Sequence, residues 1–385
     1  EYEGLYCTGC EGFKLEGDLT EDGLCPDHKK APETVKEKNY FFKLTKYRDA
    51  LLKHIDEKGD FIQPASRRNE VRSYVERFME DISISRDVGS VKCGIPVPGD
   101  DSQVIYVWFD ALINYLTGVG FGTDEEKFEK YWPANVHLVG KDIIKFHCAL
   151  WPAMLMSAGL PLPEKVFAHG FFTIDGEKMS KSLGNVIDPL EVAEKYGRDP
   201  LRYFLLKEIT FGEDGDFSLV RLGERYQNDL GNDLGNLLHR TLSMTDKYLS
   251  GKAGKGQSGK ELRNDEWRRY ESAMDQLDFG GALEVVWGIL RWSNKHIDDE
   301  KPWVLAKEGK QERIEIVMYT LLERLRHIAW MLKPFMPETS DRMLVQLGIA
   351  EQEANKTYEQ AQQWGGIPEG AIIQKGDPLF PRLEG

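Results

Sequence analysis

The sequence predicts an α/β region followed by an all-α region. Short apolar, β-branched runs alternate with helical patterns over 101–217, as expected for strands of a parallel sheet that are connected by helices. From about Ser218 onward the strand signals stop and long amphipathic stretches follow, which favours a helix bundle. A cysteine pattern in the first 30 residues adds a third feature, a metal knuckle inserted ahead of the sheet strands.

Length and charge limit the classes of protein that fit. The 385 residues suffice for two or three domains, and no apolar run approaches the roughly 20 residues of a membrane span, which excludes an integral membrane protein. The net charge is −14, but residues 1–217 carry 27 Lys and Arg against 38 Asp and Glu, whereas 218–350 carry 20 of each. The helical region is therefore neutral, so a specific polyanion partner stays open while non-specific binding is not expected.

The metal knuckle is read from the pattern Cys7-x2-Cys10-x14-Cys25-x2-His28. The pattern consists of two pairs of possible metal ligands, with two residues inside each pair and a loop between the pairs. This is the spacing of a structural zinc site with three thiolates and one imidazole. The alternative is disulfides or free thiols, although three cysteines do not pair off. The two other cysteines lack such partners and are expected to be buried, small side chains.

Five elements are expected in the α/β region. In chain order they are a strand at 103–109, a helix at 110–118, a strand at 135–139, a helix at 141–159 and a strand at 165–169. Ligands of parallel sheets lie at the carboxyl ends of the strands, so Gly140, Asp142 and His147 stand where chemistry is expected. Ile143, His147 and Trp151 are spaced by four and share one helix face, for which core packing is the competing interpretation.

The last of these strands leads into a loop with an Asp175-Gly176 turn and the string Lys178-Met-Ser-Lys-Ser182. Two lysines three apart are able to neutralise charge on a leaving pyrophosphate. A Lys-x-x-Lys pair alone is more often part of a solvated loop. The complete string, following a strand and a turn, is what indicates a phosphate-handling loop here.

Amphipathic stretches dominate the rest of the chain. Helices are expected over 225–249, 267–297 and 314–331, with a break at Lys333-Pro-Phe-Met-Pro337. A polar tail from about 350 carries scattered apolar residues and is expected to pack back on the body.

Together these strings resemble the class I aminoacyl-tRNA synthetases, and among them the methionyl-tRNA synthetases, in the bacterial or organellar form with a single zinc knuckle. The resemblance covers the whole chain and is carried by Tyr106-Val-Trp108-Phe-Asp110-Ala111, Val139-Gly-Lys-Asp-Ile143, Lys178-Met-Ser-Lys-Ser182, Ile84-Ser-Arg86-Asp87 and Lys301-Pro-Trp303. It implies activation of methionine with ATP and Mg²⁺ and transfer to tRNA(Met). It also implies four segments: a connective insertion at 1–100 with the structural zinc knuckle (7–28), the second half of a Rossmann-type catalytic domain at 101–217, a helical anticodon-binding domain at 218–350, and a tail at 351–385.

The resemblance also assigns roles to single residues. The methionine pocket would consist of Trp108, Ala111, Leu112, Tyr115, Ile143, His147 and Trp151. An uncharged thioether is recognised by shape, aromatic contacts and one or two polar tips, here Tyr115 and His147. Gly140 and Asp142 resemble the ribose-binding segment of the ATP site, and Lys178 and Lys181 the catalytic lysines. Asn236, Arg240 and Trp303 match positions that read the anticodon. A solvated helix face and a helix-end hydrophobic anchor are the competing interpretations for these three.

One departure from the family is expected to matter. The His-Ile-Gly-His-like nucleotide-binding string is absent, since no histidine has another three positions on. The chain therefore lacks that half of the site, reads as N-terminally truncated, and is predicted to be inactive alone. The rival hypotheses are a non-catalytic tRNA-binding module and a class I synthetase for another amino acid. The protein is also expected to be a monomer without a membrane partner. Its expected location is the cytoplasm, or an organellar matrix or stroma.

Overall fold

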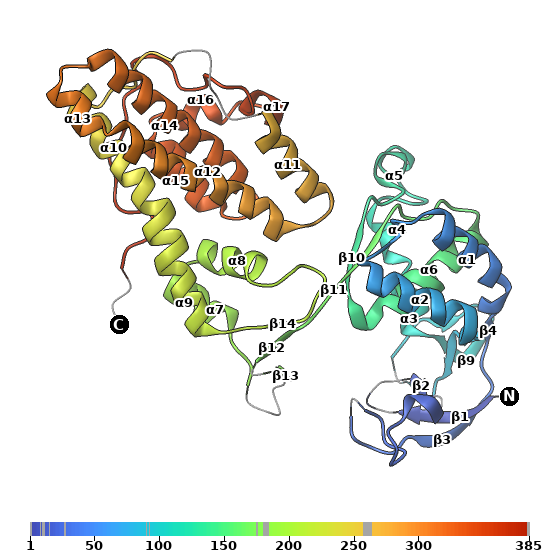
Figure 1. Ribbon diagram of the computed structural model, residues 1–385. Coiled ribbons are helices and arrows are strands. Elements are labelled where there is room, and N and C mark those ends of the chain that lie inside the picture. Colours follow the sequence, from blue (N-terminus) through green and yellow to red (C-terminus); the bar gives the residue numbers. More distant parts are fainter. Residues whose placement is uncertain are drawn as a thin grey trace. The chain divides into compact units, whose positions relative to one another are not determined.

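The computed structural model describes residues 2–7, 9, 12–14, 16–26, 28–89, 91, 93–174, 176–179, 185–256 and 264–382. The chain divides into two compact units, Glu1–His169 and Gly170–Gly385 (Figure 1). In the described part of the chain no helix combines the length and the apolar character that a membrane span requires.

The first unit begins with a small antiparallel sheet that carries the cysteine pattern. Its strands are β1 (Tyr2–Cys7), β2 (Gly12–Lys14) and β3 (Glu33–Glu37), in the order β2-β1-β3. The 3₁₀ turn η1 (Glu16–Asp18) follows β2. Cys7 ends β1, so this strand fixes the first half of the knuckle.

A parallel sheet forms the middle of the first unit, as predicted. Its strands β10 (His137–Gly140), β11 (Val166–His169) and β5 (Ile62–Gln63) run in the order β10-β11-β5, and His137 pairs with Val166 and Val166 with Ile62. Helices α1 (Arg48–Glu57) and α2 (Ala65–Arg77) bury their apolar faces in the same core as β10 and β11. Strands β10 and β11 were predicted from their apolar runs, whereas β5 is too short to leave a periodic signal.

The strand expected at 103–109 is only half correct. Strand β9 (Asp100–Ile105) pairs antiparallel with β7 (Ser85–Asp87) and β8 (Pro96–Val97), outside the parallel sheet, and helix α3 (Val107–Ala111) begins two residues after it ends. The cause is tertiary packing: Trp108 packs on the same apolar cluster as the buried Leu112 four residues later, which is a helical spacing.

The helix expected at 141–159 forms with a change of winding. It consists of η3 (Lys141–Ile143), the π-helical turn η4 (Phe146–Leu150) and α6 (Trp151–Ala158), and Gly159 ends it in the left-handed conformation at φ +70°. The other elements of the unit are β4 (Phe41–Phe42), η2 (Leu44–Tyr47), β6 (Ile82–Ser83), α4 (Asn114–Gly118) and α5 (Glu125–Tyr131).

The second unit opens with a small sheet and two helices. Strands β12 (Phe172–Ile174), β13 (Glu177–Lys178) and β14 (Gly215–Asp216) lie in the order β13-β12-β14. Helices α7 (Pro189–Tyr196) and α8 (Arg198–Lys207) lie between β13 and β14 in the chain. The hairpin of β12 and β13 leads directly into the lysine loop, of which 180–184 lie outside the described residues.

A helix bundle fills the rest of the second unit, which confirms the predicted all-α region. Its first rod is continuous through α9 (Leu219–Arg225), the π-helical η5 (Tyr226–Gly235) and α10 (Asn236–Leu249) (Figure 1). The remaining helices are α11 (Asn264–Asp275), α12 (Phe279–Glu300), α13 (Pro302–Lys307), α14 (Gln311–Leu332), α15 (Pro337–Gln346), α16 (Ala350–Glu353) and α17 (Tyr358–Ala361). The stretch expected as one helix at 267–297 is two, because Leu277 adopts φ +59° and the Asp278 side chain caps α12.

The segment after α17 packs on the bundle. Ile367, Ile373 and Leu379 are buried in the bundle core. The buried carboxylate of Glu323 on α14 accepts the backbone N–H groups of 365–367, so one α14 side chain fastens the start of the tail.

Candidate functional site

Most of the residues predicted to wall a methionine pocket converge in one cluster of the first unit. Trp108 and Ala111 lie on α3, Leu112 follows it, Tyr115 lies on α4, and Ile143, His147 and Trp151 lie along η3, η4 and α6. Leu112, His147 and Trp151 are each 1% exposed. The rings of Trp108 and Tyr115 contact that of His147 edge-on, with centroids 6.3 and 5.7 Å apart.

The polar atoms of this cluster bond to one another. The Tyr115 hydroxyl and His147 Nε2 are 2.9 Å apart, and His147 Nδ1 is 3.0 Å from the Ile143 carbonyl oxygen. Since a carbonyl only accepts, Nδ1 carries the proton and Nε2 accepts the proton of Tyr115. Burial lowers the pKa of His147 and raises that of Tyr115, so both side chains are neutral near pH 7.

Three further rings belong to the cluster and were not predicted. Phe146 stacks on Trp108 at 4.3 Å, His137 contacts Tyr115 at 4.4 Å, and Trp132 meets the ring of Trp151 edge-on at 6.1 Å. His137 Nε2 also accepts the indole N–H of Trp151 at 3.2 Å. Burial, and secondarily the neighbouring His147, lowers the pKa of His137 to about 4. The available signal was the alternation along β10, which puts His137 on the buried face with Val139.

Gly140 and Asp142 lie at the carboxyl end of β10, as predicted. A Cβ on Gly140 would stand 2.6 Å from an Asp142 carboxylate oxygen, so glycine lets that carboxylate lie close to the strand end. Asp142 is exposed, and its oxygens are open to a ligand that offers hydroxyl donors.

The lysine loop is described only in part. Lys178 ends β13, while Lys181 lies outside the described residues. The turn before it is well fixed: Asp216 accepts hydrogen bonds from the Gly176 N–H and from the Thr173 hydroxyl, both at 3.0 Å. These bonds hold the pKa of Asp216 below its usual value.

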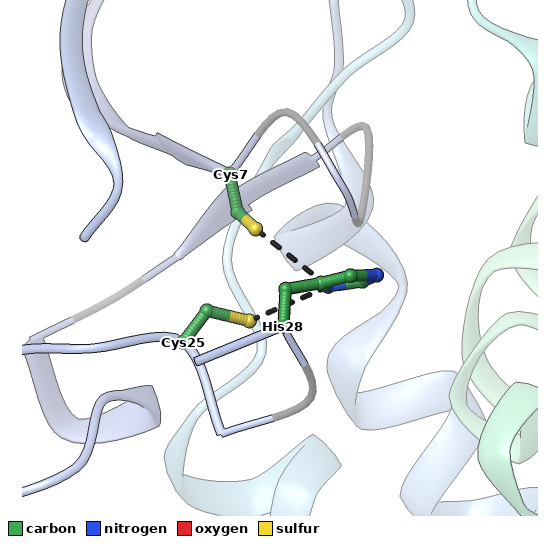
Figure 2. Close-up of side chains that lie close together, drawn as sticks. All are labelled: Cys7, Cys25 and His28. Carbon is green, nitrogen blue, oxygen red and sulfur yellow. Dashed lines mark hydrogen bonds between the residues drawn. The ribbon is translucent and has the colours of Figure 1, made fainter. Parts of the chain in front are cut away.

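Three of the four predicted metal ligands meet in the knuckle. The ligand atoms of Cys7, Cys25 and His28 lie within 4.8 Å of one another, and His28 Nδ1 is 3.9 and 3.8 Å from the two sulfurs (Figure 2). Ligands of a tetrahedral zinc ion stand roughly 3.6 Å apart, so two thiolates and an imidazole at this spacing fit such an ion. Gly9 is required here, because a Cβ would stand 2.5 Å from the His28 ring. Cys10, the fourth predicted ligand, lies outside the described residues.

The cysteines outside the knuckle differ from each other. Cys148 is buried, as expected, whereas Cys93 is exposed, so that expectation was wrong for Cys93. The sequence offered no periodic pattern around Cys93 from which its exposure could be read. Among the described residues, Cys7, Cys93 and Cys148 form no disulfide.

The predicted anticodon residues lie on the surface of the bundle. Asn236 and Arg240 are exposed on α10, and the Arg240 guanidinium is 3.5 Å from Asn294 and from Asp298 on α12. Trp303 on α13 is 40% exposed, which weakens the alternative that it anchors a helix end in the core. Asn236 also lines a groove of about 870 Å³ between the α9–η5–α10 rod and 378–382.

Arg86 has contacts that stabilise its own part of the fold. Its guanidinium stacks on the Tyr106 ring at 4.1 Å and donates to Ser83 Oγ at 2.9 Å and to the Ser85 carbonyl at 2.7 Å. Only 6% of Arg86 is exposed, so these contacts hold β7 against the residue that precedes α3.

Comparison with known families gives a match over nearly the whole chain. Residues 1–242 match the model of tRNA synthetases class I (M), and residues 252–385 match that of the anticodon binding domain of methionyl tRNA ligase. The chain belongs to the class I tRNA synthetases of the M type. The predicted recognition is therefore confirmed, as is the predicted fold class of a partial Rossmann-type sheet followed by a helical anticodon-binding domain.

Individual relatives agree with this assignment. Methionine–tRNA ligases of Caldanaerobacter subterraneus subsp. tengcongensis and Thermotoga maritima are 49% and 44% identical over the whole chain. The chain spans 61% and 62% of those proteins, about three fifths of their length. A solved structure of Mycobacterium tuberculosis methionyl-tRNA synthetase in complex with methionyl-adenylate is 40% identical, with a TM-score of 0.90 over 99% of this chain and 76% of that one.

The predicted site residues are divided between the two units of the chain. The structure brings Trp108, Leu112, Tyr115, His147 and Trp151 together, and Ile143 is joined to His147 through its carbonyl oxygen, whereas the Ile143 side chain packs with the core of the parallel sheet. Ala111 lies on α3 next to Leu112, and Gly140 and Asp142 lie at the end of β10 in the same unit. The lysine loop and the anticodon residues belong to the second unit.

Proposed function

We propose that this chain carries part of the site of a methionine–tRNA ligase, which joins methionine to ATP as methionyl-adenylate and then transfers it to tRNA(Met). The observation that carries the proposal is the set of contacting rings of Trp108, Tyr115, Phe146, His147, Trp151, Trp132 and His137, called the ring cluster from here on, whose two histidines are neutral because burial lowers their pKa. Such a surface suits a thioether, which is uncharged, polarizable and a weak acceptor. The family of the chain and the names of its relatives support the same reaction.

Methionine recognition is assigned to the cluster. Trp108, Ala111, Leu112 and Ile143 supply apolar surface, and Trp151 closes the cluster from α6. Tyr115 and His147 are the polar tips. This assignment favours methionine over branched aliphatic substrates, which need no hydroxyl and imidazole pair.

ATP is assigned to the strand end and the lysine loop. Asp142 would accept hydrogen bonds from the two ribose hydroxyls while Gly140 leaves room for the nucleotide. Lys178 and Lys181 would neutralise the charge that develops on the triphosphate when pyrophosphate leaves, with Mg²⁺ bound to the same phosphates.

The bundle is assigned to tRNA. Trp303 offers an exposed ring on which an unstacked base can lie, and Asn236 and Arg240 offer amide and guanidinium donors for base edges. Zinc is assigned to Cys7, Cys10, Cys25 and His28 as a closed structural site. We further infer a monomer that works in the cytoplasm or in an organellar matrix.

The 385 residues alone are proposed not to activate methionine, because the family's His-Ile-Gly-His-like string is missing from them. The test is methionine-dependent ATP–pyrophosphate exchange with two proteins. One is this chain. The other is a chimera that joins it to the segments of the Caldanaerobacter relative outside the aligned region. The chimera is expected to exchange and the chain is not.

The outcomes of this assay separate the rival functions. Exchange by the chain alone would overturn the proposed incompleteness. A chimera that exchanges with isoleucine, valine or cysteine instead of methionine would favour another class I specificity. A chimera that binds tRNA(Met) but exchanges with none of these amino acids would favour a tRNA-binding module.

A further inference from the structure

Trp303 lies two residues after the point where the chain turns from one helix of the bundle into the next. A single residue, Lys301, joins α12 to α13 and is called the hinge residue here. Its N–H donates to the Ile297 carbonyl at 3.0 Å, which ends α12, and its carbonyl accepts the N–H of Val304 at 2.7 Å, which starts α13. The backbone of Lys301 therefore sets the angle between the two helices and the direction in which the Trp303 ring faces.

The hinge residue has a backbone conformation that lysine disfavours. Lys301 adopts φ +48° and ψ +66°, in the left-handed region where a Cβ atom crowds the neighbouring carbonyl oxygen. A residue stays in this region only where the surrounding structure holds it there. Contacts near the end of α12 are therefore needed to keep the turn in place.

An ion pair next to the hinge residue supplies such a contact. Glu300, the last residue of α12, accepts from Arg313 Nε at 2.9 Å and also from Arg313 Nη2, so the pair is bidentate. The Glu300 side chain is 21% exposed, and the hydrogen bonds from Arg313 hold its pKa below the usual value. A forked pair fixes orientation as well as distance, so it ties the end of α12 to the first turn of α14.

The rest of α13 is attached to the bundle by apolar contacts. Pro302 is buried, and Leu305 and Ala306 pack against the bundle core. These contacts hold α13 on the bundle, while the ion pair fixes the angle at which its first turn leaves α12. That turn carries Trp303, which is 40% exposed. Because a base stacks on the plane of a ring, a change in this angle weakens stacking without unfolding the helix.

We propose that Glu300 and Arg313 are positioning residues for anticodon recognition: their ion pair fixes the hinge residue Lys301 and so presents the Trp303 ring to an unstacked base. The inference rests on the proposed function, in which Trp303 receives a base of the tRNA(Met) anticodon. Neither member of the pair needs to touch the RNA. A carboxylate near RNA repels phosphate, so a favourable effect of Glu300 on binding requires such an indirect role.

The test measures the affinity of the 385-residue chain for a cognate anticodon stem–loop. Glu300→Gln and Asp299→Asn each remove one carboxylate from the end of α12, but Asp299 pairs within that helix, with Lys295 at 2.8 Å. Relief of phosphate repulsion alone would tighten binding in both variants. The proposal predicts that Glu300→Gln binds about fivefold more weakly, which is part of the contribution of one stacked base, and that Asp299→Asn binds as well as the wild type or better.

A second variant breaks the pair from the other helix. Arg313→Gln is also expected to weaken binding, but it removes a cation as well. Both variants are therefore repeated in the Trp303→Ala background, where neither Glu300→Gln nor Arg313→Gln should weaken binding further. A lost phosphate contact would keep its effect in that background.

Stem–loops with one abasic anticodon position separate positioning from general stability. The stacked base is the one whose removal abolishes the difference between the wild type and Trp303→Ala. On that RNA the wild type and Glu300→Gln are expected to bind equally, whereas a loosened bundle would weaken binding to every RNA. The Tm of Glu300→Gln is expected to stay near that of the wild type, since the pair lies at the surface.

The results distinguish this proposal from the proposed function. If the wild-type chain binds the cognate stem–loop no better than one with an altered anticodon, the anticodon assignment fails and this inference fails with it. If the chain is specific but Glu300→Gln binds equally well or better, or weakens binding equally in the Trp303→Ala background, the proposal is overturned and the anticodon assignment stands. A lower Tm with equal weakening on all RNAs would assign the pair to stability alone, which also overturns the proposal.

Discussion

Burial sets the protonation state of the two histidines at the centre of the ring cluster. His137 is 5% and His147 1% exposed, and burial is the main cause that lowers both pKa values, that of His137 to about 4. A charged imidazole would lose its hydration without gaining a carboxylate among the hydrogen-bond partners described above. Neutral rings are also what the two acceptor roles of Nε2 require.

This pKa predicts how stability depends on pH. Between the unfolded value near 6.5 and about 4, the unfolded chain binds a proton that folded His137 does not, so stability falls as pH decreases through this window and levels off below it. The loss is about 3 kcal/mol at most. Urea unfolding of the wild type and His137→Gln at pH 7 and pH 4, followed by the fluorescence of the first unit, should show a smaller loss in the variant. Equal losses would mean that His137 titrates normally.

Trp303 and Trp292 form a matched pair for the anticodon assignment. Both are about two-fifths exposed on the bundle, but Trp292 is covered by Arg324 at 3.6 Å and by His296 at 4.6 Å. Loss of a stacked base costs about 1–3 kcal/mol, so Trp303→Ala is expected to weaken tRNA(Met) binding roughly 5- to 150-fold with little change in Tm. Filter binding and calorimetry measure the two. A large fall in Tm, or equal weakening in Trp292→Ala, would favour a packing role.

Residue-level prediction succeeded where spacing carried the signal. His147 bonds to the Ile143 carbonyl four residues earlier, as the spacing of four suggested, although the side chains of Ile143 and Trp151 pack in different clusters. His137 and Trp132 were missed because their partners lie far away in sequence: His137 bonds to Trp151, and the Trp132 indole donates to the Pro161 carbonyl. Such contacts are decided by tertiary structure, which a single sequence does not display.

Among the elements, the segment at 107–111 shows why strand and helix signals conflict. Aromatic and β-branched residues favour a strand locally, yet Val107 is 55% exposed and Trp108 packs in the direction of Leu112. The helix forms because it places the large rings on one cluster, and this packing outweighs an intrinsic preference of about 1 kcal/mol. Both faces of β11 are covered, which leaves a continuous apolar run, whereas β10 alternates between buried His137 and Val139 and the exposed Leu138.

The knuckle sheet β1–β3 has little apolar material and should depend on its metal. One zinc per chain is expected by elemental analysis. Cys25→Ala should lose the metal and unfold this sheet while the bundle stays folded, because structural zinc supplies the folding free energy of small knuckles. Cys93→Ala is the matched control, since Cys93 is an exposed free thiol outside the ligand group. Unchanged metal content in Cys25→Ala would refute the assignment.

Glu323 on α14 makes the tail dependent on one buried carboxylate. It is 0% exposed, pairs with Arg326 at 2.6 Å and accepts three backbone N–H groups from 365–367. Glu323→Ala leaves Arg326 with Glu353, at 3.2 Å, as its remaining buried carboxylate and leaves three backbone N–H groups without their acceptor, so a loss of about 2–3 kcal/mol is expected in urea unfolding, with earlier proteolysis after α17. Glu312→Ala, an exposed position on the same helix, should change stability by only a few tenths of a kcal/mol. Similar losses in both variants would exclude this role.

At the scale of the whole molecule, the net charge differs between the region proposed to bind methionine and ATP and the region proposed to bind tRNA. The acidic excess of residues 1–217 lies in the half assigned to methionine and ATP, whereas 218–350 is balanced. A balanced surface neither attracts nor repels RNA strongly, so recognition has to come from a few directed contacts such as Arg240 and Trp303. Composition alone predicted a poor polyanion binder, and only the regional division made a specific RNA partner plausible.

This division predicts the salt dependence of RNA binding by the 385-residue chain. If about three cationic side chains contact phosphates in a single-stranded loop, the slope of log K against log salt is roughly −2. A cognate anticodon stem–loop should therefore lose only roughly 15-fold in affinity between about 50 and 200 mM salt. A stem–loop with one altered anticodon base should bind roughly tenfold or more weakly at every salt concentration. A slope steeper than about −5 with equal affinity for both RNAs would indicate non-specific phosphate binding, and the bundle would then lose its assignment as an anticodon reader.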